Sequence, residues 1–155
     1  MATAGGRVQW PRDRFLFVVV ATVIVLRKGG PEGKLARAFA TLDFILPKTP
    51  RQRRLWILLA LTAGICEELL FRGFLFRYLH EIVPALPPMC ILLVAAAVFG
   101  INHLYQGFIG ALGTAFLAIL FGVMFVGTGN LALPMALHAL LDLRVLAIPT
   151  RTRDA

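Results

Sequence analysis

The feature that most constrains this chain is a pair of carboxylates and a guanidinium inside an apolar segment. Glu67, Glu68 and Arg72 lie within residues 55–79, a run that is long and apolar enough to form a membrane-spanning helix. An ionisable side chain at the centre of a bilayer costs about 2.5 to 3.5 kcal/mol on insertion scales. Three such side chains in one short stretch therefore indicate a functional site rather than a contribution to stability.

The spacing of these three residues predicts different roles for the two acids. Glu68 and Arg72 are four residues apart, so a helix places them on one face, where they can form an ion pair. Glu67 lies about 100° further round the helix axis. We expect Glu67 to have no cation of its own, which suits it to act as a general acid or base.

Composition places the chain among integral membrane proteins. Apolar residues make up 59% of the 155 residues, and the mean hydropathy is +0.80. The net charge of +8 comes from residues 1–54, which contain 11 Lys and Arg against 3 Asp and Glu, because residues 55–155 contain 5 of each. These basic residues flank apolar segments and include no series of aromatic residues for base stacking. We expect contact with membrane lipid and no nucleic-acid partner.

The apolar segments predict an all-α fold, a polytopic transmembrane helix bundle with four core spans and a short N-terminal apolar helix. Residues 15–26 would form the short helix, which at about 18 Å is too short to cross a hydrocarbon core of ~30 Å alone. Breaks at Gly, Pro and charged residues separate the four core spans, which we place at residues 55–79, 89–105, 107–126 and 131–148.

These predicted spans divide the chain into a basic N-terminal region (residues 1–54), an intramembrane core (55–150) and a basic tail (151–155). Four crossings return the C-terminus to the side of the basic loop at residues 27–54. The positive-inside rule then makes both cytoplasmic in a multi-pass cell-membrane protein.

Three of the spans each carry two residues at i, i+4 spacing, which places the two on one helix face. The pairs are Glu68 with Arg72, Phe99 with His103, and His138 with Asp142. Their similar depth in the spans suggests that the ionisable residues meet in one cavity. The candidate site residues are Glu67, Glu68, Arg72, His103, His138 and Asp142. In the third span, small residues recur every four positions, a pattern typical of close helix packing: Gly110, Thr114, Ala118 and Gly122.

The same residues form three motifs in order: EELLFR at residues 67–72, FGINH at 99–103 and HALLD at 138–142. This combination resembles the CPBP family of intramembrane proteases, which includes the type II CAAX prenyl endopeptidases and bacterial Abi-like proteins. Its motifs are EExxxR, FxxxH and HxxxN/D on successive core helices. The resemblance covers about residues 55–150.

The resemblance implies an intramembrane endopeptidase of the CAAX-processing or bacteriocin-processing type, whose peptide or protein substrate enters from the membrane. Glu67 and His103 would hold and activate a water molecule, and His138 would donate to the developing oxyanion. Glu68 and Arg72 would keep the site in shape. Asp142 stands at the N/D position, where it would orient His138 or remain protonated.

The sequence is also compatible with other mechanisms and functions. Two His and one Glu can also form a catalytic zinc site, although we favour a glutamate-type mechanism that requires no cofactor. Intramembrane Glu, His, Asp and Arg also occur in proton relays and transporters, and a non-catalytic immunity or interaction protein is a third class. A thiol mechanism at Cys66 is disfavoured, because nothing in an apolar helix activates the thiol.

Overall fold

The computed structural model describes residue 20 and residues 46–147 of the chain, and no β-strand occurs among them. The elements are α3 (Pro50–Glu68), η1 (Leu69–Leu75), α4 (Phe76–Ile82), α5 (Pro88–Asn102), η2 (Leu104–Gln106), α6 (Gly107–Thr128), α7 (Ala132–Leu143) and η3 (Arg144–Ala147). The predicted all-α class is confirmed for this part. The predicted N-terminal helix and basic tail lie outside the described residues.

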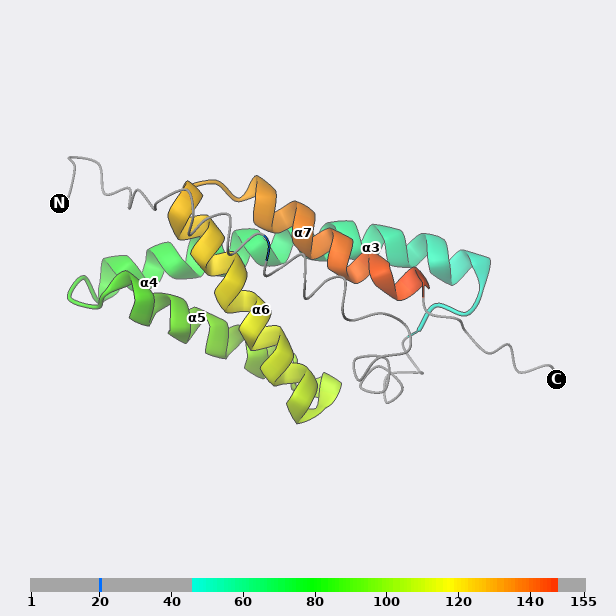
Figure 1. Ribbon diagram of the computed structural model, residues 1–155, viewed down its shortest axis with the longest axis horizontal. Coiled ribbons are helices and arrows are strands. Elements are labelled where there is room, and N and C mark those ends of the chain that lie inside the picture. Colours follow the sequence, from blue (N-terminus) through cyan, green and yellow to red (C-terminus); the bar gives the residue numbers. More distant parts are fainter. Residues whose placement is uncertain (1–19, 21–45, 148–155) are drawn as a thin grey trace.

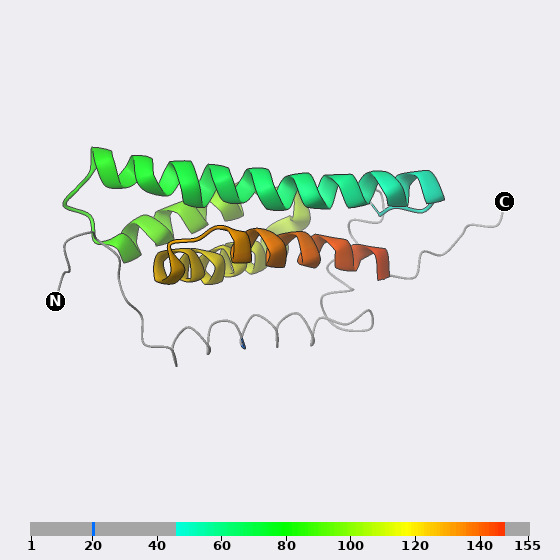
Figure 2. The same ribbon diagram turned by 90° about the horizontal axis from the view of Figure 1, so that it is seen from above.

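The first predicted span is part of one continuous helix formed by α3, η1 and α4 (Figure 2). Its start is defined by a capping box, in which the Thr49 side chain accepts from the Gln52 backbone and the Gln52 side chain accepts from the Thr49 backbone. Pro50 at the first helical position suits this start. The segment η1 is a π-helix, which the sequence did not predict, and it begins directly after Glu68. Such segments occur frequently at functional sites.

The second and fourth predicted spans are shorter in the structure than expected. Helix α5 ends at Asn102, and the 3₁₀ turn η2 follows it. Helix α7 ends at Leu143 and continues only as the 3₁₀ turn η3. Two side chains of α3 bind carbonyl groups there: Trp56 donates to Asp142 at 2.9 Å and Arg53 to Leu146 at 2.7 Å. These bonds satisfy carbonyl groups that the end of a helix leaves without partners.

The helices pack as two pairs, α3 with α7 and α5 with α6, and Figures 1 and 2 both show α7 lying along α3. Each pair approaches closely at a glycine. A Cβ on Gly64 would lie 2.8 Å from the backbone nitrogen of Ala139, and one on Gly100 would lie 2.8 Å from the Ala115 Cβ. Gly64 and Ala139 stand within one turn of the candidate site, so their contact fixes how near α3 and α7 can come.

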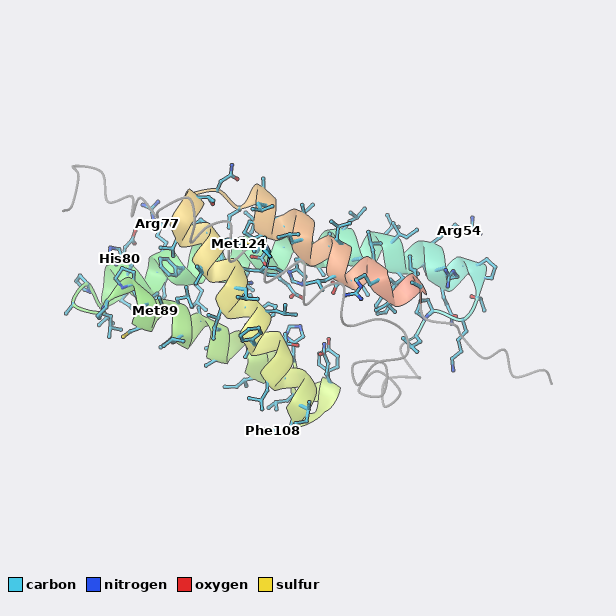
Figure 3. All side chains as sticks on the ribbon, viewed as in Figure 1. Arg54, Arg77, His80, Met89, Phe108 and Met124 are labelled. Carbon is cyan, nitrogen blue, oxygen red and sulfur yellow. The ribbon has the colours of Figure 1, made fainter. Side chains whose placement is uncertain are left out.

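Large apolar side chains cover much of the outside of the described bundle. Phe108 is 69% exposed, whereas Met124 is 1% exposed between the helices (Figure 3). Among the described residues, one helical segment, Leu104–Thr128, is long and apolar enough to cross a membrane by length and composition. The shorter apolar helix Pro88–Asn102 lies beside it. Such an apolar exterior is unusual for a protein in water.

We predict that Gly64→Ala destabilises the bundle, because the added methyl group would overlap the α7 backbone. Overpacking of this kind costs about 1 to 3 kcal/mol. The matched control is Gly113→Ala in α6, where an added Cβ meets no atom within 4 Å. Thermal unfolding in detergent micelles should show a lower Tm for Gly64→Ala alone. Equal Tm values for the two variants would contradict this account of the α3 and α7 contact.

Candidate active site

The base of the candidate site is a buried ion pair between Glu68 and Arg72. Arg72 Nη1 lies 2.9 Å from Glu68 Oε1, and their side chains are 5% and 0% exposed. The predicted i, i+4 pair is therefore present. Arg72 also donates through Nη2 to the carbonyl oxygen of Ala118 at 3.1 Å, which ties the π-helical segment to α6. A buried pair is favourable only when its remaining hydrogen-bonding groups also find partners.

Two aromatic rings enclose the guanidinium of Arg72. The Arg72 Cζ lies 4.9 Å from the Phe99 ring centroid and 5.8 Å from that of Phe121. Phe99 also makes an edge contact with Phe71 at 4.7 Å. This arrangement explains why a phenylalanine stands four residues before His103: its ring packs over a cation that is otherwise surrounded by apolar groups.

The orientation of His138 is set by Glu68. Its Nδ1 lies 3.0 Å from Glu68 Oε1, the oxygen that also accepts from Arg72. An ionised carboxylate only accepts, so Nδ1 is the donor in this bond. The Nε2 atom then faces two other acids, at 3.7 Å from Glu67 Oε2 and 3.8 Å from Asp142 Oδ2. His138 therefore lies between three carboxylates.

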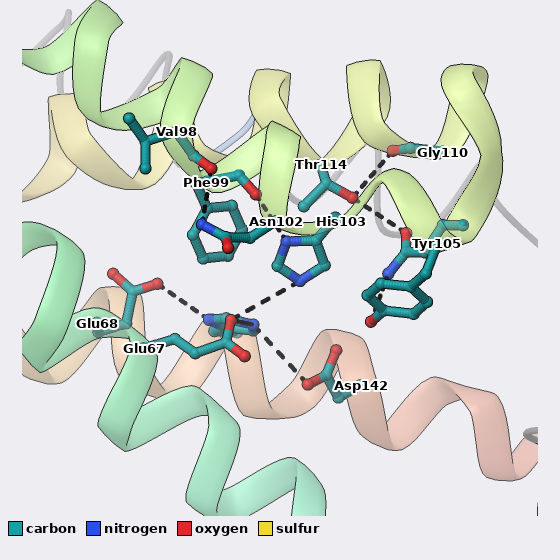
Figure 4. Close-up of polar contacts among 12 residues, drawn as sticks. Glu67, Glu68, Val98, Phe99, Asn102, His103, Tyr105, Gly110, Thr114 and Asp142 are labelled. Carbon is teal, nitrogen blue, oxygen red and sulfur yellow. Dashed lines mark hydrogen bonds and ion pairs between the residues drawn. The ribbon is translucent and has the colours of Figure 1, made fainter.

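The orientation of His103 is set by its own helix. Its Nδ1 lies 2.8 Å from the carbonyl oxygen of Phe99, which can only accept, so Nδ1 must donate. In a neutral ring Nε2 is then an acceptor, and it lies 3.9 Å from Glu67 Oε2. His103 follows the last residue of α5, where the chain leaves the α-helix, so its ring reaches across to the end of α3 (Figure 4).

Glu67 lies where α3, α7 and the turn after α5 meet. Its side chain is 32% exposed, but its Oε2 atom is buried and has no hydrogen-bond partner among the described residues. When neutral, His103 and His138 each present an unprotonated Nε2 to this oxygen. Separations of 3.7 and 3.9 Å are too long for direct hydrogen bonds. The arrangement is suited to a group that brings its own protons, such as a water molecule.

All six residues predicted for the site thus come together from α3, η1, α7 and the turn that follows α5. Figure 4 shows Glu67, Glu68, His103 and Asp142 among them. Sequence reasoning missed Phe121, whose ring contacts both Arg72 and His138. It also missed Trp56, whose indole N–H donates to the backbone carbonyl of Asp142. An aromatic residue in an apolar span gives no signal in the sequence that could have identified either role.

Comparison with known families supplies the assignment. The family described as type II CAAX prenyl endopeptidase Rce1-like matches residues 50–144, which is most of the chain. The chain belongs to this family. The comparisons with curated proteins and with solved structures found no match. Rce1-like proteins are membrane-embedded peptidases, so the family predicted from the three motifs is confirmed, together with its classification as a hydrolase.

The side chains of the site include residue types that can bind a metal ion. Glu67, His103 and His138 are ligand types that zinc accepts. Their arrangement does not match a metal site, however: in the part of the chain that the structure describes, no three His, Cys, Asp or Glu side chains are placed to hold an ion. We therefore derive no step through a metal, and the expectation that none is required stays a prediction.

The buried ion pair leads to a prediction about stability. Arg72→Met keeps the volume but leaves the Glu68 carboxylate buried without a cation, a change that costs about 3 to 5 kcal/mol. Arg77→Met is the matched control, because Arg77 pairs with Glu81 at the same spacing but is 81% exposed. Unfolding in detergent micelles should show a large fall in Tm for Arg72→Met and little change for the control. Similar Tm values would show that the buried pair does not organise the fold.

Proposed function

We propose that the chain is an intramembrane endopeptidase in which Glu67 activates a water molecule for attack on a peptide bond. The observation that carries this proposal is the position of Glu67 Oε2, which lies 3.9 Å from His103 Nε2 and 3.7 Å from His138 Nε2. His103 directs an unprotonated Nε2 to this oxygen because its Nδ1–H is engaged with the Phe99 carbonyl. The Nδ1–H of His138 is engaged with Glu68, so a charged His138 carries its second proton on Nε2. A water molecule is a double donor and satisfies two of these acceptors at once.

The chemical steps follow from the acceptors and donors. Water donates one hydrogen bond to Glu67 and the other to His103 Nε2, which leaves an oxygen lone pair to attack the scissile carbonyl carbon. As the C–O bond forms, Glu67 takes the proton and later delivers it to the leaving amine nitrogen as the C–N bond breaks. Protonated His138 has an Nε2–H that can donate to the oxyanion. Asp142, 3.8 Å from that nitrogen, would keep the ring in place.

The division of labour between the two acids supports this mechanism. Glu68 is fully buried and already accepts from Arg72 and His138, so it has no free access to a substrate. Glu67 is partly exposed and makes no such bonds. One acid is therefore suited to holding the site together and the other to proton transfer.

We further propose that the helices α3 to α7 cross the cell membrane as a multi-pass bundle of four spans, within an intramembrane core at residues 55–150. The apolar exterior supports this, since a chain with charged groups inside and large apolar groups outside is suited to lipid. The basic loop at residues 27–54 and the C-terminus would lie in the cytoplasm under the positive-inside rule.

The substrate is proposed to be a membrane-associated peptide or protein that enters from the lipid. The family description names a type II CAAX prenyl endopeptidase. A bacteriocin leader would be cleaved by the same chemistry at a peptide bond.

The test is cleavage of a labelled panel of membrane peptides by purified protein, with and without a tight zinc chelator. We predict that Glu67→Ala and His103→Ala abolish cleavage while chelation has no effect. Controls are Glu81→Ala and His80→Ala, which remove exposed residues of the same types from α4.

Each outcome of this test separates one proposal from another. Loss of wild-type cleavage on chelation would show that the site uses a metal ion in catalysis. Cleavage that survives both site substitutions would contradict the assigned roles. If wild type cleaves nothing while proton flux across vesicles responds to the same substitutions, the proton-relay function replaces the protease.

A further inference from the structure

The proposed reaction needs hydrogen-bond donors for the oxyanion, and the cluster around Glu67 offers few. Glu67 and Asp142 accept when ionised, and His103 uses its Nδ1–H on the Phe99 carbonyl. His138 uses its Nδ1–H on Glu68, so it can donate from Nε2 only when protonated. A neutral donor beside this cluster would complement it, because removal of one oxyanion donor typically costs ~10²–10³ in kcat.

Tyr105 is placed to supply that donor. It belongs to η2, two residues beyond His103, and its ring centroid lies 5.7 Å from that of His103. In Figure 4 the hydroxyl end of Tyr105 points toward the side of the cluster where Asp142 lies. Tyr105 is 60% exposed, so a substrate can reach it. Its oxygen accepts a hydrogen bond from Gln106 Nε2 at 3.1 Å, which leaves the phenolic O–H proton available to donate.

A short chain of polar side chains supports this tyrosine. The Thr114 hydroxyl lies 3.2 Å from Gln106 Oε1 and 2.9 Å from the Gly110 carbonyl, so its proton is shared between two acceptors. The bonds then run in one direction, from Thr114 to the Gln106 amide and from that amide to the Tyr105 oxygen. Linked bonds polarise one another, which makes the phenol a better donor.

Two glycines give Gln106 its position. Gly107 has φ +78°, a conformation that favours glycine and lets the chain turn from η2 into α6. A Cβ on Gly110 would lie 2.7 Å from the Gln106 Cβ, so only glycine leaves room for this side chain. Gly110 thus leaves space for the Gln106 side chain and Thr114 donates a hydrogen bond to it. The sequence pattern alone predicted that both residues would pack against another helix.

We propose that the phenolic O–H of Tyr105 donates a hydrogen bond to the carbonyl oxygen of the scissile peptide bond, with Gln106 and Thr114 as positioning residues. The inference rests on the proposed peptidase function and adds a second oxyanion donor to His138. No bond is made or broken at Tyr105, because it stabilises charge that develops on the substrate.

The test compares Tyr105→Phe with Tyr78→Phe, the same loss of one hydroxyl group at an exposed tyrosine that stacks on Phe74 in α4. A donor that acts on the oxyanion should lower kcat about 10- to 100-fold with little change in KM, since hydrogen bonds to charged groups are the stronger ones. Tyr78→Phe should leave both constants as in wild type, and circular dichroism should show that both variants fold.

A second variant tests the supporting chain. Thr114→Val should lower kcat in the wild-type background. It should have no further effect when Tyr105 is already Phe, because the series of hydrogen bonds from Thr114 through Gln106 would then lead to no hydroxyl group. Equal effects of Thr114→Val in both backgrounds would overturn the positioning role.

The outcomes distinguish this inference from the proposed function. If wild type cleaves peptides and Tyr105→Phe keeps kcat within about twofold, or changes KM alone, the oxyanion role of Tyr105 is overturned while the peptidase stands. If wild type cleaves no peptide, the proposed function fails, and the inference fails with it.

Discussion

The structure depends on the buried contact among Glu68, Arg72 and His138. One carboxylate oxygen accepts from both the guanidinium and the imidazole, at 2.9 and 3.0 Å, and this single point joins α3, the π-helical segment and α7. Arg72 extends the contact to α6 through the Ala118 carbonyl. Because charges buried in apolar surroundings are costly when unpaired, the helices can pack only where these partners meet. The same packing directs the His138 Nε2 toward Glu67.

An apolar exterior and a charged interior are two sides of the same constraint. In lipid, backbone groups must be satisfied within the helices and ionisable side chains must face one another. Glycines at the α3–α7 and α5–α6 contacts let backbones approach closely, which brings the polar groups of different helices within reach. Trp56 and Arg53 of α3 further connect that helix to the C-terminal end of α7 and to η3, by donating to the carbonyl oxygens of Asp142 and Leu146.

Much of this was predictable because spacing on a helix fixes which side chains share a face. The i, i+4 spacing predicted the Glu68 and Arg72 pair and placed Glu67 apart from it, and the motifs predicted the family. Other features depend on contacts between distant segments, which spacing does not encode. The π-helical turn, the bond from Trp56 to the Asp142 backbone, and the use of Gly110 to seat Gln106 became visible only in three dimensions.

The most direct test of the account is a paired measurement of peptide cleavage and Tm for Glu67→Gln and Glu68→Gln. These variants remove the same charge from adjacent residues of one helix. The account predicts that Glu67→Gln loses cleavage but keeps its Tm, whereas Glu68→Gln has a clearly lower Tm because Arg72 is left without its carboxylate. A Glu67→Gln protein that still cleaves, or a Glu68→Gln protein with the Tm of wild type, would contradict it.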